Sequence, residues 1–198
     1  MQRYRRISSF LIVLIGFSFI SCNPLLNFGS IVPDKFFRSG QPDKDDLKAI
    51  LPKGIKTIIN LKKSVEGFEM RLAARYGVAL EHIKMSADRP PTDSQLETYF
   101  GLLDNPNNYP IWMHCQGGAD RTGVMTAIYR LEYQNWSKVD AIKEMIRYFH
   151  IPPAHPRLTK YIRHYQRQRR TYVETPEELE VLDAIIEQAE KEYLKSLE

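Results

Sequence analysis

The stretch that decides the fold is His114-Cys115-Gln116-Gly117-Gly118-Ala119-Asp120-Arg121-Thr122-Gly123. Just before it, the apolar run at 110–113 predicts a short buried strand. Just after it, residues 122–135 carry apolar side chains at helical spacing. The segment therefore predicts a strand, a tight loop and a helix. Since the loop N–H groups and the start of the helix lie together in such a turn, the loop is expected to bind an anion.

The residue types in this loop suit a phosphate group in particular. Gly117 and Gly118 permit backbone conformations closed to other residues, so successive N–H groups can converge on one anion. The same positive field favours the thiolate form of Cys115, which is the nucleophilic form. The planar guanidinium of Arg121 can bind two phosphate oxygens at once. We therefore predict a phosphate loop (residues 115–121) in which Cys115 and Arg121 are catalytic and phosphate is bound by Gln116, Gly117, Gly118, Ala119, Asp120 and Arg121.

The pattern His-Cys-x-x-Gly-x-x-Arg-Thr-Gly resembles the signature of the protein tyrosine and dual-specificity phosphatases. Two further stretches, 37–42 and 54–61, resemble the opening of the atypical dual-specificity phosphatases of plants and fungi and their bacterial relatives. The resemblance covers about residues 33–150. It implies a phosphatase that hydrolyses phosphomonoesters through a cysteinyl-phosphate intermediate, with Cys115 as nucleophile and Arg121 as phosphate ligand. Neither the resemblance nor any Cys and His spacing in the sequence indicates a cofactor or a metal.

A leaving group needs a proton from a positioned acid, and two aspartates are candidates. Asp88 follows a predicted strand and lies 27 residues before Cys115, roughly where dual-specificity phosphatases hold their acid. Asp120 lies inside the phosphate loop, a position that resembles the loop aspartate of myotubularin and Sac-type phosphoinositide phosphatases. We favour Asp88, because a carboxylate within the loop also repels a dianion. Asp120 is the alternative acid. The third possibility is that neither aspartate is the acid.

Several polar side chains around the site invite simpler interpretations. His114 ends a strand, so it is expected to orient the loop rather than carry a proton. Arg38 and Asn60 are expected to tie loops together, with Arg38 also a candidate for the rim of the site. Either lysine of the pair 62–63 could meet a second phosphate, although a solvated turn is the simpler interpretation. The histidines at 150 and 155 flank two prolines and are expected at the surface.

Strands alternate with helices along most of the chain, which predicts an α/β fold. We expect a mostly parallel central sheet of about four or five strands with helices on both faces, and helices at the C-terminus. The expected organisation is a signal or anchor at 1–22, a tether at 23–34, a phosphatase domain at 35–155 and a helical extension at 156–198. In such sheets a ligand lies beyond the carboxyl ends of the strands, where Cys115 falls.

The first 22 residues differ from the rest of the chain. Arginines at 3, 5 and 6 precede the apolar stretch 10–20, which ends at Ser21-Cys22. The stretch is short for a membrane span, which needs about 20 residues. Cys22 after a small residue resembles a bacterial lipoprotein cleavage site and is the predicted point of lipid attachment, although Phe19 replaces the usual leucine. We therefore expect an exported protein anchored in the bacterial envelope, with an uncleaved anchor or a buried or cytosolic segment as alternatives.

Charge excludes one class of partner. The chain carries a formal charge of +4, but residues 1–22 hold three arginines and no acid, so the remainder is nearly neutral. Nucleic-acid binding is therefore not expected. Residues 157–170 are basic and residues 174–198 acidic, with apolar residues at heptad spacing in the second segment. These segments are expected to dock on each other or on the domain; docking on an anionic bilayer or dimerisation are the alternatives, and the oligomeric state is not indicated.

The expected partner is a phosphorylated substrate: a phosphoprotein, an inositol phosphate or a phospholipid. An exported site lies where phosphotyrosine proteins of the cell itself are scarce, so an inositol phosphate or phosphoinositide phosphatase is the alternative function. The phosphate loop contains no lysine, which argues against highly charged substrates. A binding module without turnover is an alternative of another class. Sulfur transfer or arsenate reduction is a weaker one, because no resolving cysteine accompanies Cys115.

Overall fold

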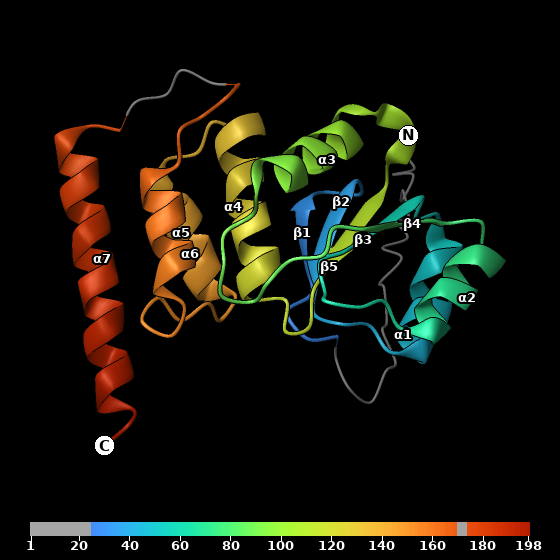
Figure 1. The fold of residues 1–198 in the computed structure, drawn as a ribbon, viewed down its shortest axis with the longest axis horizontal. Coiled ribbons are helices and arrows are strands. Elements are labelled where there is room, and N and C mark those ends of the chain that lie inside the picture. Colours follow the sequence, from blue (N-terminus) through green and yellow to red (C-terminus); the bar gives the residue numbers. More distant parts are fainter. Residues whose placement is uncertain (1–24, 170–173) are drawn as a thin grey trace, which may run out of the picture.

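A computed structural model describes residues 25–169 and 174–198, so the predicted signal and Cys22 lie outside the described residues. Its centre is a five-stranded sheet (Figure 1). The spatial order is β1 (Gly29–Val32), β2 (Phe36–Ser39), β5 (Ile111–His114), β3 (Thr57–Asn60) and β4 (Ala79–His82). All neighbouring strands are parallel except β1, which pairs antiparallel with β2. The predicted α/β fold with a mostly parallel sheet is therefore confirmed.

Seven α-helices accompany the sheet within the described residues. They are α1 (Lys44–Ile50), α2 (Gly67–Arg75), α3 (Asp93–Asp104), α4 (Asp120–Tyr133), α5 (Lys138–Arg147), α6 (Pro156–His164) and α7 (Pro176–Lys195). Three of them begin at capping boxes, in which the side chains of Asp43, Thr92 and Thr175 accept hydrogen bonds from the first turn. These caps satisfy N–H groups that the helix itself leaves without partners, and so fix where each helix starts.

The helices cover both faces of the sheet because apolar residues continue on both sides of each central strand. Ile58 and Trp112 pack in one core cluster with residues of α1 and α2. Ile59 and Met113, one position further along the same strands, pack in the other cluster with residues of α3 to α7. This alternation follows from the two-residue period of a strand. Figure 1 shows α1 and α2 on one side of the sheet and α3 to α5 on the other.

Two segments belong to the folded domain although the sequence places them outside it. Residues 29–32 fall in the expected tether but form β1, whose Ile31 is buried in the larger core cluster. Residues 156–164 fall in the expected C-terminal extension but form α6, whose Ile162 is fully buried in the same cluster. Buried apolar side chains at both ends therefore extend the domain beyond the expected limits of 35 and 155.

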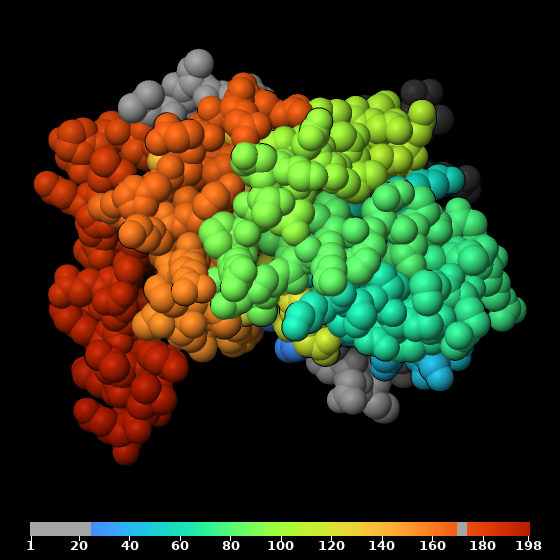
Figure 2. Space-filling model, viewed as in Figure 1, coloured from blue at the N-terminus to red at the C-terminus, as the bar shows by residue number. Residues whose placement is uncertain are grey.

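The last helix docks on the domain, as its charge pattern predicts. Leu182 of α7 is fully buried, and α7 packs along α5. Arg163 of α6 pairs with Asp183 of α7 at 2.6 Å. In Figure 2, α7 lies in red along one side of the molecule, against the orange segment that contains α5 and α6. No helix within residues 25–169 and 174–198 is long and apolar enough to cross a membrane.

Candidate active site

The phosphate loop lies at the carboxyl end of β5, in the middle of the sheet. Cys115 directly follows β5 and is almost completely buried. The loop leads into α4, whose N-cap residue Ala119 makes no side-chain hydrogen bond to the helix start. The first N–H groups of α4 are therefore not capped by that side chain, and they add to the positive field at the loop.

Four successive carbonyl groups of the loop accept hydrogen bonds from groups outside it. The donors are His114 Nδ1 at 3.3 Å to Cys115, the Gln41 N–H at 3.0 Å to Gln116, Asn27 Nδ2 at 2.7 Å to Gly117 and Arg38 Nη2 at 2.6 Å to Gly118. In a planar trans peptide the C=O and the following N–H point in opposite directions. Holding these carbonyls on the outer side therefore turns the N–H groups of residues 116–119 toward the inside. One of them, Gly118 N–H, donates to Cys115 Sγ at 3.2 Å.

Only one of the two loop glycines is required by the backbone. Gly118 has φ of +71°, and a Cβ atom there would lie 2.5 Å from the backbone nitrogen of Gly40. The loop thus packs directly on the backbone after β2. A Cβ atom at Gly117 would meet nothing within 4 Å. The prediction that both glycines permit conformations closed to other residues is therefore wrong for Gly117.

Arg121 lies in the first turn of α4 and is half-buried. Its Nη1 donates to the carbonyl oxygen of Leu61, just beyond β3, at 3.4 Å. This contact holds the guanidinium at the carboxyl edge of the sheet, where the phosphate loop also lies. The remaining N–H groups of a guanidinium so placed can bind phosphate oxygens.

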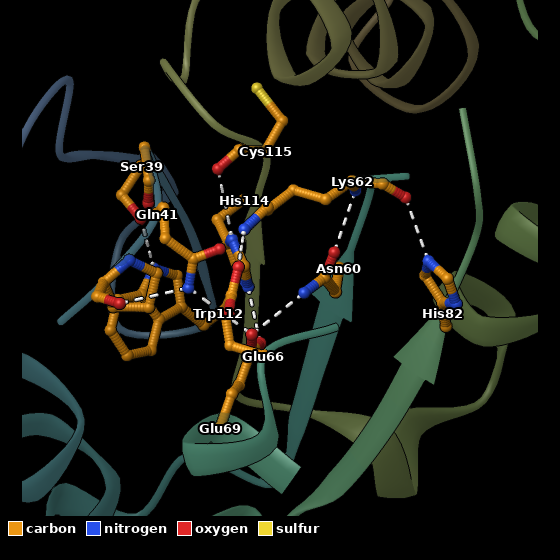
Figure 3. Close-up of polar contacts among 12 residues, drawn as sticks. Ser39, Gln41, Asn60, Lys62, Glu66, Glu69, His82, Trp112, His114 and Cys115 are labelled. Carbon is orange, nitrogen blue, oxygen red and sulfur yellow. Dashed lines mark hydrogen bonds and ion pairs between the residues drawn. The ribbon is translucent and has the colours of Figure 1, made fainter. Parts of the chain in front are cut away.

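His114 orients the loop from behind, as its place at the end of a strand predicts (Figure 3). Its Nε2 lies 2.8 Å from Glu69 Oε1, and both side chains are fully buried. Burial alone would raise the pKa of Glu69, but hydrogen bonds from His114, Asn60 and Gln41 outweigh it and lower that pKa. Because the Cys115 carbonyl oxygen can only accept, Nδ1 of His114 donates to it, while Glu69 contacts the other ring nitrogen and fixes the orientation of the ring.

Arg38 supports the loop from β2. Its side chain is almost fully buried and its guanidinium lies 3.8 Å from the ring centroid of Tyr148. Burial lowers the pKa of Arg38 to about 10, and the charge of Glu144 opposes this effect. Arg38 thus ties loops together as expected, but it is not part of an exposed rim.

Asp88 lies in an exposed loop between β4 and α3, with a side-chain exposure of 59%. It accepts a hydrogen bond from Ser86 and lies 3.6 Å from Arg157 of α6. The hydrogen bond from Ser86 lowers the pKa of Asp88. The contacts of Asp88 with Ser86 and Arg157 in this arrangement of the loop favour its carboxylate form, whereas a general acid donates from its protonated form.

Asp120, the first residue of α4, faces two histidines. His150 Nδ1 lies 2.7 Å from its Oδ1, and His155 Nε2 lies 3.5 Å from its Oδ2. His150 is fully buried, and its Nε2 lies 2.9 Å from Thr159 Oγ1. The prediction of a surface His150 is therefore wrong. Sequence reasoning missed this contact because its partners lie 30 residues apart and no spacing pattern joins them.

The lysines after β3 do not form a second phosphate site in this structure. Lys62 Nζ pairs with Glu66 at 2.7 Å, and its side chain is 8% exposed. Lys63 is exposed in the turn that follows β3. Within residues 25–169 and 174–198, no group of three or more His, Cys, Asp or Glu side chains could hold a metal ion.

A mostly parallel sheet with a buried cysteine at its carboxyl edge, an inward-facing N–H loop and an arginine at the start of the next helix is typical of the class of cysteine-dependent phosphatases. The family model described as "DSP-PTPase phosphatase fused to NAD+ Kinase" matches residues 31–161. The chain belongs to this family of dual-specificity-type phosphatase domains.

Individual relatives agree with this assignment. The dual specificity protein phosphatase TpbA of Pseudomonas aeruginosa is 27% identical over 125 residues, which are 63% of this chain and 56% of TpbA. The inositol diphosphatase DSP5 of Arabidopsis thaliana is 27% identical over 126 residues, 61% of each protein. The chain thus matches little more than half the length of these curated relatives.

Solved structures share the fold. The core catalytic domain of the PP-IP phosphatase SIW14 from S. cerevisiae is 26% identical, with a TM-score of 0.65 over 74% of this chain and 89% of that one. The crystal structure of P. aeruginosa TpbA is 21% identical, with a TM-score of 0.62 over 84% of this chain and 94% of that one.

Proposed function

We propose that this protein is a metal-independent phosphatase that hydrolyses phosphomonoesters through a cysteinyl-phosphate intermediate. The observation that carries the proposal is the loop around Cys115: four carbonyls are held outward, and the Gly118 N–H already donates to the sulfur. N–H groups so oriented stabilise both a thiolate and the oxygens of a bound phosphoryl group. The family of the chain supports the same function.

The reaction has two steps. In the first, the Cys115 thiolate attacks phosphorus, the bond from phosphorus to the ester oxygen breaks, and an acid protonates the leaving oxygen. Arg121 and the loop N–H groups hold the three equatorial oxygens of the phosphoryl group. In the second, water attacks phosphorus, the S–P bond breaks and the thiolate returns with inorganic phosphate as product. We propose Asp88 as the acid after its loop has moved, with Asp120 as the alternative.

The proposed substrate is a phosphoprotein, of the kind that a tyrosine or dual-specificity protein phosphatase hydrolyses, as the name of TpbA suggests. Inositol phosphates are the second candidate, favoured by the similarity to an inositol diphosphatase and to SIW14. The pairing of Lys62 with Glu66 supports the first candidate, since it leaves that lysine engaged rather than directed at a second phosphate.

The test is hydrolysis of an aryl phosphate by the purified protein in excess EDTA, with Cys115→Ser in parallel. We expect wild-type turnover that survives the chelator and is lost with the cysteine, while Cys115→Ser still binds inorganic phosphate. Turnover by Cys115→Ser would contradict the mechanism. A folded wild-type protein that binds phosphate but never forms product would instead identify a binding module. A panel of phosphotyrosine peptides, phosphoinositides and inositol phosphates then separates the substrate candidates.

We also propose that the protein is exported to the bacterial envelope and anchored to a membrane by a lipid on Cys22. The support is the order of arginines, apolar stretch and Ser21-Cys22 at the N-terminus. Palmitate labelling of the wild type and of Cys22→Ala tests the proposal, together with globomycin, which blocks lipoprotein signal cleavage. Label on the wild type alone and a larger precursor under globomycin are expected. An unlabelled wild type of unchanged size would contradict lipid attachment and leave the uncleaved anchor and the buried or cytosolic segment as the alternatives.

A further inference from the structure

A short segment before β1 covers the outer side of the phosphate loop. This segment, residues 25–28, lies ahead of the region that the family model matches. Leu25 packs against the core cluster on the α1 and α2 side of the sheet, and the ring of Phe28 stacks on Phe37 at 6.1 Å. The Leu26 carbonyl accepts a hydrogen bond from the Gly40 N–H at 2.6 Å. Three contacts therefore fix the segment beside the loop.

Asn27 is the residue of this segment that reaches the loop itself. Its Nδ2 donates to the Gly117 carbonyl oxygen at 2.7 Å, across 90 residues of sequence. Its backbone has φ of +52°, in the left-handed region that asparagine adopts more readily than most residues. The residue type thus suits both the turn of the chain and the contact that the side chain makes.

The hydrogen bond from Asn27 acts on the peptide group that faces the nucleophile. The Gly117 carbonyl and the Gly118 N–H belong to one planar trans peptide, so they point in opposite directions. Asn27 binds the carbonyl from outside, and the N–H donates to Cys115 Sγ at 3.2 Å on the inside. A hydrogen bond to the carbonyl also polarises the peptide group and so strengthens the hydrogen bond that its N–H donates. The side chain is therefore linked to the sulfur through a single peptide unit.

We propose that Asn27 is a positioning residue of the active site, which holds the Gly118 N–H toward the Cys115 sulfur and the bound phosphate. The proposal rests on the proposed role of the phosphate loop and adds to it a group from outside the matched family region. Its consequence is that the stretch that follows the predicted lipid attachment site is part of the catalytic architecture and not a passive tether.

The test uses the full chain with two variants and one matched control. Asn27→Gly removes the carboxamide and keeps a residue that tolerates positive φ. Asn27→Asp keeps the shape, but a carboxylate cannot donate to a carbonyl. The control is Asn135→Gly, at another positive-φ asparagine (φ +56°), between α4 and α5. Three quantities are measured: binding of inorganic phosphate by calorimetry, kcat/KM on an aryl phosphate, and the rate at which iodoacetamide alkylates Cys115 at mildly acidic pH.

We expect Asn27→Gly to lower phosphate affinity, kcat/KM and the alkylation rate of Cys115 each by about fivefold to tenfold, the value of one hydrogen bond. Asn27→Asp should lower phosphate affinity further, because its charge also repels the anion. Asn135→Gly should change none of the three by more than about twofold. The melting temperatures of the two glycine variants should lie close together, since the backbone tolerates glycine at both sites.

Phosphate affinity and alkylation rate in Asn27→Gly within about twofold of the wild type would overturn the proposal, whatever the effect on turnover. An equal loss in Asn135→Gly would also overturn it, because the effect would then be a general one of losing an asparagine. If the wild type binds phosphate without turning over any ester, the proposed function fails, while the effect of Asn27→Gly on phosphate binding still decides the role of Asn27.

Discussion

His150 Nδ1 lies 2.7 Å from Oδ1 of Asp120, so a fully buried histidine holds the carboxylate that opens α4. The second oxygen of Asp120 faces His155 at 3.5 Å, and Arg157, two residues further along, pairs with Asp88. Both candidate acids therefore contact the short segment 155–157. Their environments differ, because Asp120 is enclosed by histidines whereas Asp88 lies in an exposed loop whose hydrogen bond from Ser86 lowers its pKa.

The first prediction separates the two aspartates. If Asp88 is the acid, Asp88→Asn slows phosphate esters with poor leaving groups by about 100-fold or more but changes activated aryl phosphates little, since only poor leaving groups need a proton. Asp120→Asn should then lower the rates for esters with poor leaving groups and for activated aryl phosphates alike, because Asp120 lies in the phosphate loop. Rates for a series of leaving groups of graded basicity check this. The reverse pattern would assign the proton to Asp120.

The second prediction concerns His150. His150→Gln should destabilise the protein by about 1–3 kcal/mol, because Asp120 and Thr159 lose a buried partner. Urea unfolding measures the change, and the exposed His164 provides the control variant His164→Gln. Equal unfolding midpoints for His150→Gln and the control would show that the contact adds nothing to stability.

The third prediction concerns the buried pair of Glu69 and His114. The pKa of Glu69 is lowered in the folded protein, so the ionised carboxylate contributes its full stabilisation at pH values above its ordinary pKa of 4.5. This contribution is lost as the pH falls through the lower pKa of the folded state. Wild-type stability should therefore decrease with acid in that window, and Glu69→Gln should decrease less. Urea midpoints at a series of pH values test this. Glu97→Gln, at an exposed position of α3, should follow the wild type.

The fourth prediction compares three glycines. Gly118→Ala should cost about 1–3 kcal/mol and lower kcat/KM by about 100-fold, because its Cβ would lie 2.5 Å from backbone atoms and the loop must shift. Gly117→Ala should fold normally, since its Cβ meets open space. Gly101→Ala, in α3 with nothing near its Cβ, should stabilise the helix by about 0.5–1 kcal/mol. Thermal unfolding and kinetics on an aryl phosphate provide the comparison, and a Gly118→Ala variant of wild-type activity would disprove the role of close backbone packing.

Much of the fold could be predicted from local patterns. The start of a helix such as α3, at the capping threonine 92, can be predicted from sequence because a cap and an apolar period depend only on neighbouring residues. The strand, loop and helix around Cys115 are readable for the same reason. β1 was not predicted, because Pro24, Gly29 and Pro33 favour a loop in this stretch, and only the antiparallel pairing with β2 and the burial of Ile31 define the strand.

The sequence by itself was enough to predict a nucleophile, an arginine and an anion-binding loop, because the chemistry of that prediction is contained in seven consecutive residues, 115–121. Only the tertiary structure decided what holds that loop in place. Asn27, Arg38 and Glu69 act on it from three separate elements, and His150 from a fourth. The physical reason is that a hydrogen bond depends on distance and direction in space. Neither quantity is recorded in the spacing of residues along the chain until the sheet brings the carboxyl ends of its strands together.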